Sequence, residues 1–231
     1  DLIEEIARMH GLEQLPEVTP AAIAVPGAED QAVRAEELCR QTLLGFGLTE
    51  AMHYSFLAAA ELMTFDPSAK DRHLVLPNPV SADYDVMRNS LLPQLTASLG
   101  RNHARQVEAP ALFEIGRVFG QDEQGRPSEA KHLALGLSGP FGRQVLDRRR
   151  PISNQEAMLW LKGLIESLLT RLHAPVPEWA VQEFPAFEPG WSTVIHLEGA
   201  PIGRMGLIKA ALRHPWRLNN PLAVAELPLD P

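Results

Sequence analysis

Three carboxylates at the start of the chain have the spacing of one helical face. Asp1, Glu4 and Glu5 stand at positions i, i+3 and i+4, and Arg8 follows within the next turn. Carboxylate oxygens without nitrogen or sulfur partners suit Mg²⁺, which usually keeps several of its waters. The alternative is an ordinary solvated acidic face, and the spacing alone leaves both open. We therefore take Asp1, Glu4 and Glu5 as candidate metal ligands.

Several other chemistries are excluded by what the sequence lacks. The eight histidines are scattered, with no His-Glu-x-x-His pattern, so a zinc hydrolase is not expected. No Gly-x-Ser-x-Gly elbow of an α/β-hydrolase occurs. Gly203 and Gly206 lie between strand-like residues and do not open a helix, which disfavours a phosphate-binding loop. The single cysteine, Cys39, excludes a disulfide framework and a Cys-rich metal site. We predict no catalytic residues.

The composition is that of a globular protein with a substantial core. Hydrophobic residues make up 45% of the 231 residues and charged residues 22%. The net charge of −8 argues against a free-standing nucleic-acid binder, because phosphate contacts need a basic face. No apolar run reaches the 18 residues of a membrane span, and no signal peptide is visible. We expect a cytoplasmic protein with no membrane association.

The first 28 residues form a separate segment. Residues 1–10 have the pattern of the end of an amphipathic helix, with Gly11 as its stop. Residues 12–28 contain three prolines and little periodicity, which is typical of a linker. The chain begins inside a helical pattern and stops soon after a strand-like run, so we expect a piece of a longer protein. We place the domain boundary between residues 28 and 29.

Residues 29–231 alternate sets of strands with single helices. The apolar periodicities predict four helices, eight strands and a short helical turn. Hairpin-length turns join most of the strands, which favours an α+β fold with an antiparallel or mixed sheet flanked by helices. The predicted helices are 29–47, 58–65, 91–105 and 154–173, the strands are 51–56, 73–76, 111–119, 131–138, 178–184, 192–197, 201–208 and 222–229, and the helical turn is 209–214.

Two segments carry the most specific motifs. The first, 111–120, reads Ala-Leu-Phe-Glu-Ile-Gly-Arg-Val-Phe-Gly and contains Glu114, Gly116 and Arg117 at the centre of a buried strand. The second is an Asn-Pro loop followed by Met-Arg-Asn-Ser-Leu-Leu-Pro at 87–93. Its arginine precedes an apolar helix, so we expect it to be buried against a carboxylate, and its serine could cap that helix. The motif residues of this second segment are Asn78, Pro79, Arg88 and Ser90.

With these motifs and the carboxylates at its start, the chain resembles the class II-like domain of the β subunit of bacterial phenylalanyl-tRNA synthetase. The resemblance implies the fold of a class II aminoacyl-tRNA synthetase core. Such a core would place an arginine after the central strand, where it clamps the ATP α-phosphate and the amino-acid carboxylate, but this chain has Gly120 there. The closing strand-to-helix turn that ends in arginine is also missing after 223–227. The resemblance therefore implies a core without catalytic residues, inactive by itself.

The resemblance also implies cofactors and partners. In this family the helix before the core binds a Mg²⁺ ion shared with the α subunit, through one further Asp that would precede residue 1. The whole ligase charges tRNA(Phe) with phenylalanine, uses ATP, and works as an (αβ)₂ heterotetramer in which α holds the active site. This chain would pack against α. It departs from the family pattern at Glu188 and Lys209, where histidines are usual nearby.

Three aromatic residues near two prolines are candidates for the subunit interface. Phe184, Phe187 and Trp191 are large side chains in a predicted loop, and a partner subunit would cover them. A well-buried core could absorb them instead. Two other functions stay open: an active class II-type ligase with displaced catalytic residues, and a stand-alone interaction module derived from a synthetase fold.

Overall fold

The computed structural model describes residues 1–231 except 19–30, 68–72, 80, 123, 143–149 and 230–231. The chain divides into two units, Asp1–Asp30 and Gln31–Pro231. Most of the predicted linker and the start of the predicted helix at 29–30 lie outside the described residues.

The first unit contains one amphipathic helix. α1 (Leu2–His10) ends at Gly11, whose φ of 99° is favourable for glycine and whose N–H donates to the carbonyl of Ala7. A 3₁₀ turn, η1 (Leu12–Gln14), follows. None of the residues in α1 is buried.

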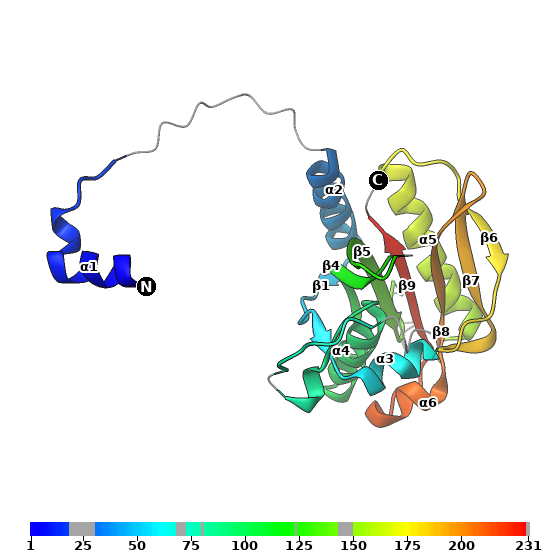
Figure 1. Ribbon diagram of the computed structural model, residues 1–231. Coiled ribbons are helices and arrows are strands. Elements are labelled where there is room, and N and C mark those ends of the chain that lie inside the picture. Colours follow the sequence, from blue (N-terminus) through cyan, green and yellow to red (C-terminus); the bar gives the residue numbers. More distant parts are fainter. Residues whose placement is uncertain (19–30, 68–72, 80, 123, 143–149, 230–231) are drawn as a thin grey trace. The chain divides into compact units, whose positions relative to one another are not determined.

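The second unit is built on a seven-stranded sheet in the order β1-β4-β5-β9-β8-β7-β6 (Figure 1). β1 pairs with β4 in parallel, and every other neighbouring pair is antiparallel. The strands are β1 (Thr49–Glu50), β4 (Ala111–Gln121), β5 (Pro127–Ser138), β6 (Glu178–Val181), β7 (Phe187–Leu197), β8 (Ala200–Ile208) and β9 (Leu222–Pro228).

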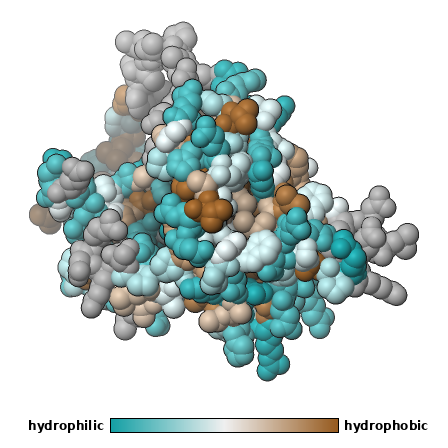
Figure 2. Space-filling view, turned by 90° about the vertical axis from the view of Figure 1, so that its right-hand side faces the viewer, coloured by the Kyte–Doolittle hydropathy of each residue, from teal (hydrophilic) through white to brown (hydrophobic). Residues whose placement is uncertain are grey.

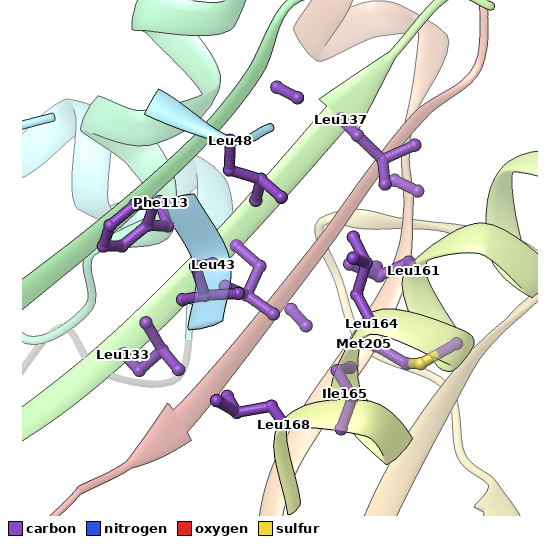
Figure 3. Packing of buried hydrophobic residues seen from close by; sticks show 14 of the residues in the cluster. Leu43, Leu48, Phe113, Leu133, Leu137, Leu161, Leu164, Ile165, Leu168 and Met205 are labelled. Atoms are coloured by element: carbon purple, nitrogen blue, oxygen red, sulfur yellow. The ribbon is translucent and has the colours of Figure 1, made fainter. Parts of the chain in front are cut away.

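Helices cover both faces of this sheet, and alternation along the strands fills both cores. α2 (Gln31–Gly45) and α5 (Asn154–Arg171) pack on one face, where Phe113 of β4 joins Leu43 and Leu161 in the larger cluster (Figure 3). The neighbouring Leu112 points to the opposite face, where it meets the smaller cluster around α4 (Leu92–Ala104). The predicted α+β fold is confirmed.

Short elements surround α4. β2 (Phe56–Leu57) and β3 (Val86–Met87) form a two-stranded sheet, next to which lie α3 (Ala59–Phe65) and η3 (Ala82–Tyr84). After β8 come α6 (Ala210–Arg213) and η5 (His214–Trp216). Gly100 of α4 lies so close to the Trp216 ring that a Cβ atom there would overlap it.

Several predicted strands differ in extent. β5 begins at Pro127 instead of residue 131, and β6 ends at Val181 instead of residue 184. β7 begins at Phe187 instead of residue 192, so part of the predicted loop is strand.

The segment predicted as one strand at 51–56 leaves the large sheet after Ala51, whose N–H donates to Phe113, and re-enters strand structure only at β2. Its alternation comes from His53, which points inward to a carboxylate, and not from sheet pairing. Within 73–76 only Val75 makes a β-bridge, to Val86.

Candidate functional site

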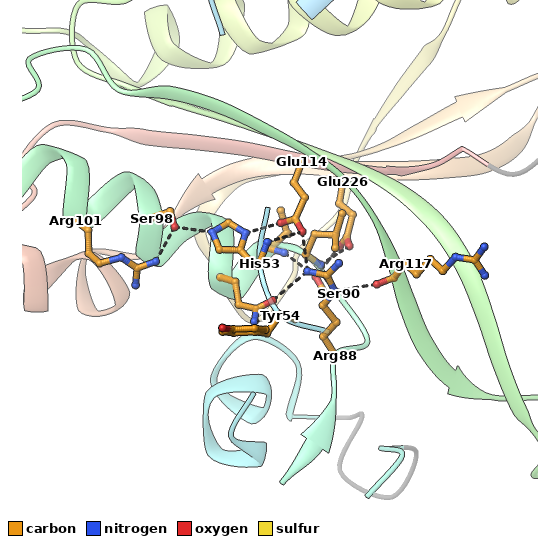
Figure 4. A network of polar contacts seen from close by, with 12 residues as sticks. His53, Tyr54, Arg88, Ser90, Ser98, Arg101, Glu114, Arg117 and Glu226 are labelled. Atoms are coloured by element: carbon orange, nitrogen blue, oxygen red, sulfur yellow. Dashed lines mark hydrogen bonds and ion pairs between the residues drawn. The ribbon is translucent and has the colours of Figure 1, made fainter. Parts of the chain in front are cut away.

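Two carboxylates are buried on the α4 side of the sheet. Glu114 of β4 is 1% exposed and Glu226 of β9 is 4% exposed. An ionised carboxylate is stable in such a place only when cations and hydrogen-bond donors surround it. The groups around each carboxylate therefore define the polar site of this domain (Figure 4).

Glu114 is held by Arg88 and His53. Arg88 Nη1 lies 2.7 Å from Glu114 Oε1, and His53 Nδ1 lies 2.6 Å from Oε2. The backbone N–H of His53 also donates to Oε1 at 3.3 Å. Burial alone would raise the pKa of Glu114, but the hydrogen bond from His53 and the charge of Arg88 outweigh it and lower the pKa. The carboxylate is therefore ionised at neutral pH.

Arg88 also ties its own segment to the end of β4. Its Nε donates to the carbonyl of Arg117 at 2.8 Å, and its backbone carbonyl accepts from Phe119 N–H at 2.7 Å. Gly116 leaves room for this guanidinium, because a Cβ atom there would overlap Arg88 Nη2. The predicted burial of Arg88 against a carboxylate is confirmed, with Glu114 as the partner.

Glu226 binds the start of α4. Its carboxylate accepts from Ser90 Oγ at 2.7 Å and from the backbone N–H of Leu91, the N-cap residue of α4, at 2.8 Å. Arg204 Nη2 lies 3.1 Å away and His132 Nδ1 3.2 Å away. Burial favours a raised pKa, but these donors and the charge of Arg204 lower the pKa of Glu226 to about 2. Ser90 Oγ in turn accepts from Leu92 N–H at 3.2 Å, but the N-cap position belongs to Leu91, which makes no side-chain cap hydrogen bond, so the prediction of Ser90 as the helix cap is wrong by one residue.

The Glu114 network extends outward to α4. His53 Nε2 lies 2.6 Å from Ser98 Oγ, and Arg101 Nη2 donates to the same hydroxyl oxygen at 2.6 Å. Beside His53 and Arg101 opens a hollow of about 570 Å³, whose wall includes Met52 and Tyr54. The lining of the hollow is mixed, because Glu61 and Gln94 also contribute to its wall beside apolar residues such as Met52 and Leu57.

The remaining predicted motif residues lie outside these networks. Asn78 and Pro79 are exposed in the loop before η3. The side chain of Arg117 is on the surface, where it pairs with Glu129. Arg117 therefore contributes only its carbonyl to the site.

The candidate metal ligands do not converge. Within the part of the chain that the structure describes, no three acidic, histidine or cysteine residues are grouped closely enough to hold a metal ion. Glu5 is instead paired with Arg8 at 2.7 Å. Asp1, Glu4 and Glu5 do not by themselves fit a Mg²⁺ ion, so a site there would need ligands from outside this chain.

The predicted interface aromatics are more buried than expected. Phe187 is 1% exposed and belongs to the core around α4, so its assignment to an exposed face is wrong. Gly206 on the neighbouring strand makes the space for its ring, which a Cβ atom would overlap. Phe184 and Trp191 are only partly buried. On the side drawn in Figure 2, outside the grey atoms, hydrophobic residues stand mostly singly among hydrophilic ones.

The two departures from the expected pattern have a local structural role. Glu188 accepts from the backbone N–H of Ala210 at 2.7 Å and lies 3.6 Å from Arg213. Lys209 is the N-cap residue of α6. Glu188 therefore holds the turn that follows β8 through its carboxylate, whereas Lys209 takes part through its backbone, without a side-chain cap hydrogen bond.

Gly120 stands near the end of β4, beside a hollow of about 380 Å³. The described residues that line this hollow include Asp66 and Glu129 but no lysine or arginine. A Cβ atom at Gly120 would meet only Ser128 Oγ, at 3.7 Å. Packing therefore leaves room for a larger residue at Gly120, and the described residues of the wall present no positive charge to a phosphate.

Residues 15–229 match the family described as the phenylalanyl tRNA synthetase beta chain CLM domain. This chain belongs to that family. The phenylalanine–tRNA ligase beta subunit of Synechocystis sp. is 33% identical over 234 residues, covering 100% of this chain and 27% of the relative. That of Moorella thermoacetica is 32% identical, covering 99% and 27%. The chain thus spans under a third of the length of these relatives.

A solved structure shows the same fold. Desulfitobacterium hafniense PylSc, a pyrrolysyl tRNA synthetase, superposes with a TM-score of 0.66 at 17% identity, covering 99% of this chain and 73% of that one. The predicted synthetase-like fold is thereby confirmed. No helix in the described residues of this β-chain domain is long and apolar enough to cross a membrane.

Sequence reasoning missed most of the polar site. His53, Ser98 and Arg101 belong to no motif, and they meet only because the segment after β1 crosses α4. Glu226 could have been recognised from the sequence, because it is the one charged residue in the apolar run of β9. A carboxylate flanked by inward-facing alanine, valine and leucine predicts buried partners, although not their identity.

Proposed function

We propose that this chain is the non-catalytic class II-like core of a phenylalanyl-tRNA synthetase β subunit. It supports the ATP-dependent charging of tRNA(Phe) by packing against a catalytic α subunit in an (αβ)₂ assembly in the cytoplasm. Mg²⁺, ATP and tRNA belong to the whole enzyme, and any metal ligation by Asp1, Glu4 and Glu5 requires further ligands from outside this chain.

The hollow beside Gly120 is the observation that carries the non-catalytic assignment. Adenylation develops charge on phosphate oxygens, and catalysis of such steps depends on cations held in place around them. The described wall of this hollow supplies Asp66 and Glu129 and no cation, and Glu129 is already paired with Arg117. A triphosphate would gain no stabilisation there.

An exposed apolar surface on α2 supports packing against another subunit. This helix buries Cys39 and Leu43 against the sheet. Near its ends Val33, Leu44 and Phe46 remain 62%, 49% and 42% exposed. Val33 lies near the start of α2, whereas Leu44 and Phe46 lie at its end and just beyond it, so Leu44 and Phe46 are the candidates for one contiguous apolar contact.

Pyrophosphate exchange tests this proposal. The chain alone should show no phenylalanine-dependent exchange of labelled pyrophosphate into ATP above a buffer control. The β subunit that contains it, co-purified with its α subunit, should show full exchange. Exchange by the chain alone would overturn the non-catalytic assignment, and failure of the full-length β subunit to co-purify with α would overturn the packing role.

A further inference from the structure

We propose that Ser98 is an activated nucleophile that accepts acyl groups from small uncharged carboxylic esters and releases them to water. Ser98, His53 and Glu114 form a continuous chain of hydrogen bonds (Figure 4). His53, its middle member, lines the hollow beside Met52 and Tyr54. This activity is separate from the proposed function and uses neither ATP nor a partner subunit.

The ionised Glu114 fixes the proton on His53 Nδ1, and the neutral form of His53 then determines the direction of the hydrogen bond to Ser98. Glu114 is ionised and can only accept, so His53 Nδ1 carries a proton and donates it to Oε2 at 2.6 Å. In the neutral imidazole, Nε2 then holds a lone pair directed at Ser98 Oγ, 2.6 Å away. The serine hydroxyl donates to it. This is the arrangement of a nucleophile, a base and a group that orients the base.

The Ser98 hydroxyl differs from the threonine hydroxyls of three other helices. Thr42, Thr64 and Thr170 donate to carbonyls of their own helix four residues back, as such side chains usually do. The Ser98 hydroxyl instead contacts the side chains of His53 and Arg101. Its hydrogen bonds are therefore made to a base and a cation.

Arg101 supplies the positive charge that acyl transfer needs. Its Nη2 donates to Ser98 Oγ at 2.6 Å, and the residue is exposed. Gln94, Ala97 and Arg101 line the hollow from one face of α4, the face that also carries Ser98. An ester carbonyl placed over Ser98 would thus lie next to the Arg101 guanidinium, with a space of about 570 Å³ for the acyl group whose apolar wall includes Met52, Leu57 and Ala97.

The step balances within these groups. Ser98 Oγ attacks the ester carbonyl carbon while its proton passes to His53 Nε2, and Arg101 stabilises the negative carbonyl oxygen. The bond to the leaving alcohol then breaks, and the alcohol takes the proton from His53. Water, activated by His53, hydrolyses the acyl-serine, so that one ester and one water give one acid and one alcohol.

A fluorophosphonate probe tests the nucleophile directly on the full chain. Ser98 attacks phosphorus, fluoride leaves, and the labelled peptide is identified by mass spectrometry. We expect label on Ser98 and measurable turnover of p-nitrophenyl acetate. Ser98→Ala should lose both, and His53→Gln should slow labelling by about 10²-fold or more. Arg101→Gln, at an exposed position, should slow it without loss of fold.

Ser90 is the internal control. It also lies between a carboxylate and an arginine, Glu226 and Arg204, but its hydroxyl donates to the carboxylate and not to a histidine, and the residue is 4% exposed. It should stay unlabelled.

Absence of label on Ser98 in the folded chain, or ester turnover by Ser98→Ala equal to that of the unsubstituted chain, overturns the proposal. Equal labelling of Ser90 and Ser98 overturns the role of His53. Thermal melts of each variant establish that the comparison is made on folded protein.

Discussion

Replacing Glu226 by glutamine should destabilise the domain, and the loss should depend on pH. In the native fold the pKa of Glu226 falls from the usual 4.5 to about 2, although burial opposes the shift. At about 1.4 kcal/mol per pKa unit, the ionised carboxylate contributes on the order of 3 kcal/mol at neutral pH. The glutamine amide keeps one oxygen as an acceptor, but its NH₂ group replaces the other. That NH₂ group would face donors, either Leu91 N–H and His132 or Ser90 and Arg204. We therefore expect Glu226→Gln to lower the free energy of unfolding by about 2–4 kcal/mol at pH 7.

The sign of the pH dependence follows from the direction of the shift. A carboxylate with a depressed pKa stabilises the fold above the pKa of the unfolded state, and this stability is lost as the pH falls through the native pKa. The difference in stability between the unsubstituted chain and the Glu226→Gln variant should therefore be full at pH 7. It should shrink below about pH 4.5 and vanish near pH 2, the native pKa.

Urea unfolding followed by circular dichroism at a series of pH values measures this difference. The matched control is Glu166→Gln on α5, where the carboxylate lies 3.5 Å from Lys162 and 44% of its side chain is exposed. That change should stay within about 0.5 kcal/mol. A Glu226→Gln protein as stable as the unsubstituted one at pH 7, or a loss that does not change between pH 7 and pH 3, would refute the reasoning.

Two further predictions concern packing and the buried thiol. Gly100→Ala should lower the free energy of unfolding by about 1–3 kcal/mol, because its Cβ would overlap Trp216. Gly163→Ala on α5 should raise it by about 0.5–1 kcal/mol, because a Cβ there meets nothing within 4 Å. Urea midpoints that rank the two variants the other way would contradict this. Cys39 is 0% exposed, and burial together with the charge of Glu36 raises its pKa to about 11. The thiol should therefore react with DTNB only after unfolding. Rapid reaction in native buffer would show that α2 is not packed as described.

The sequence predicted those helices and strands in which the apolar residues recur regularly and turn or capping residues mark both ends. Ser153 caps α5 through Glu156 N–H, and the helix runs from Asn154 to Arg171, close to the predicted 154–173. The strand predicted at 111–119 is β4, slightly longer at Ala111–Gln121. In both, local pattern and tertiary packing favour the same structure.

The segment at 51–56 was mispredicted because tertiary contacts decide its conformation. Its alternation of small, polar and aromatic residues has the period of a strand. In the structure His53 keeps the inward direction of that pattern but binds the side chain of Glu114 instead of pairing in the sheet, while the Tyr54 and Phe56 rings stack with centroids 5.3 Å apart. The partner of His53 lies 61 residues later in the chain, so no local pattern could have revealed it.

The same long-range contacts occupy the buried carboxylates of the sheet. The oxygens of Glu226 are occupied by Leu91, Ser90, His132 and Arg204, and those of Glu114 by Arg88 and His53. Charges that would otherwise face a ligand instead bind segments of the chain to one another, with α4 fixed across the sheet as the result. A variant that frees one of these oxygens should therefore loosen α4 before it gains any affinity for a substrate. Ser98 is the exception, because its hydroxyl bonds to no carboxylate among the described residues and both of its side-chain partners, His53 and Arg101, line an open hollow.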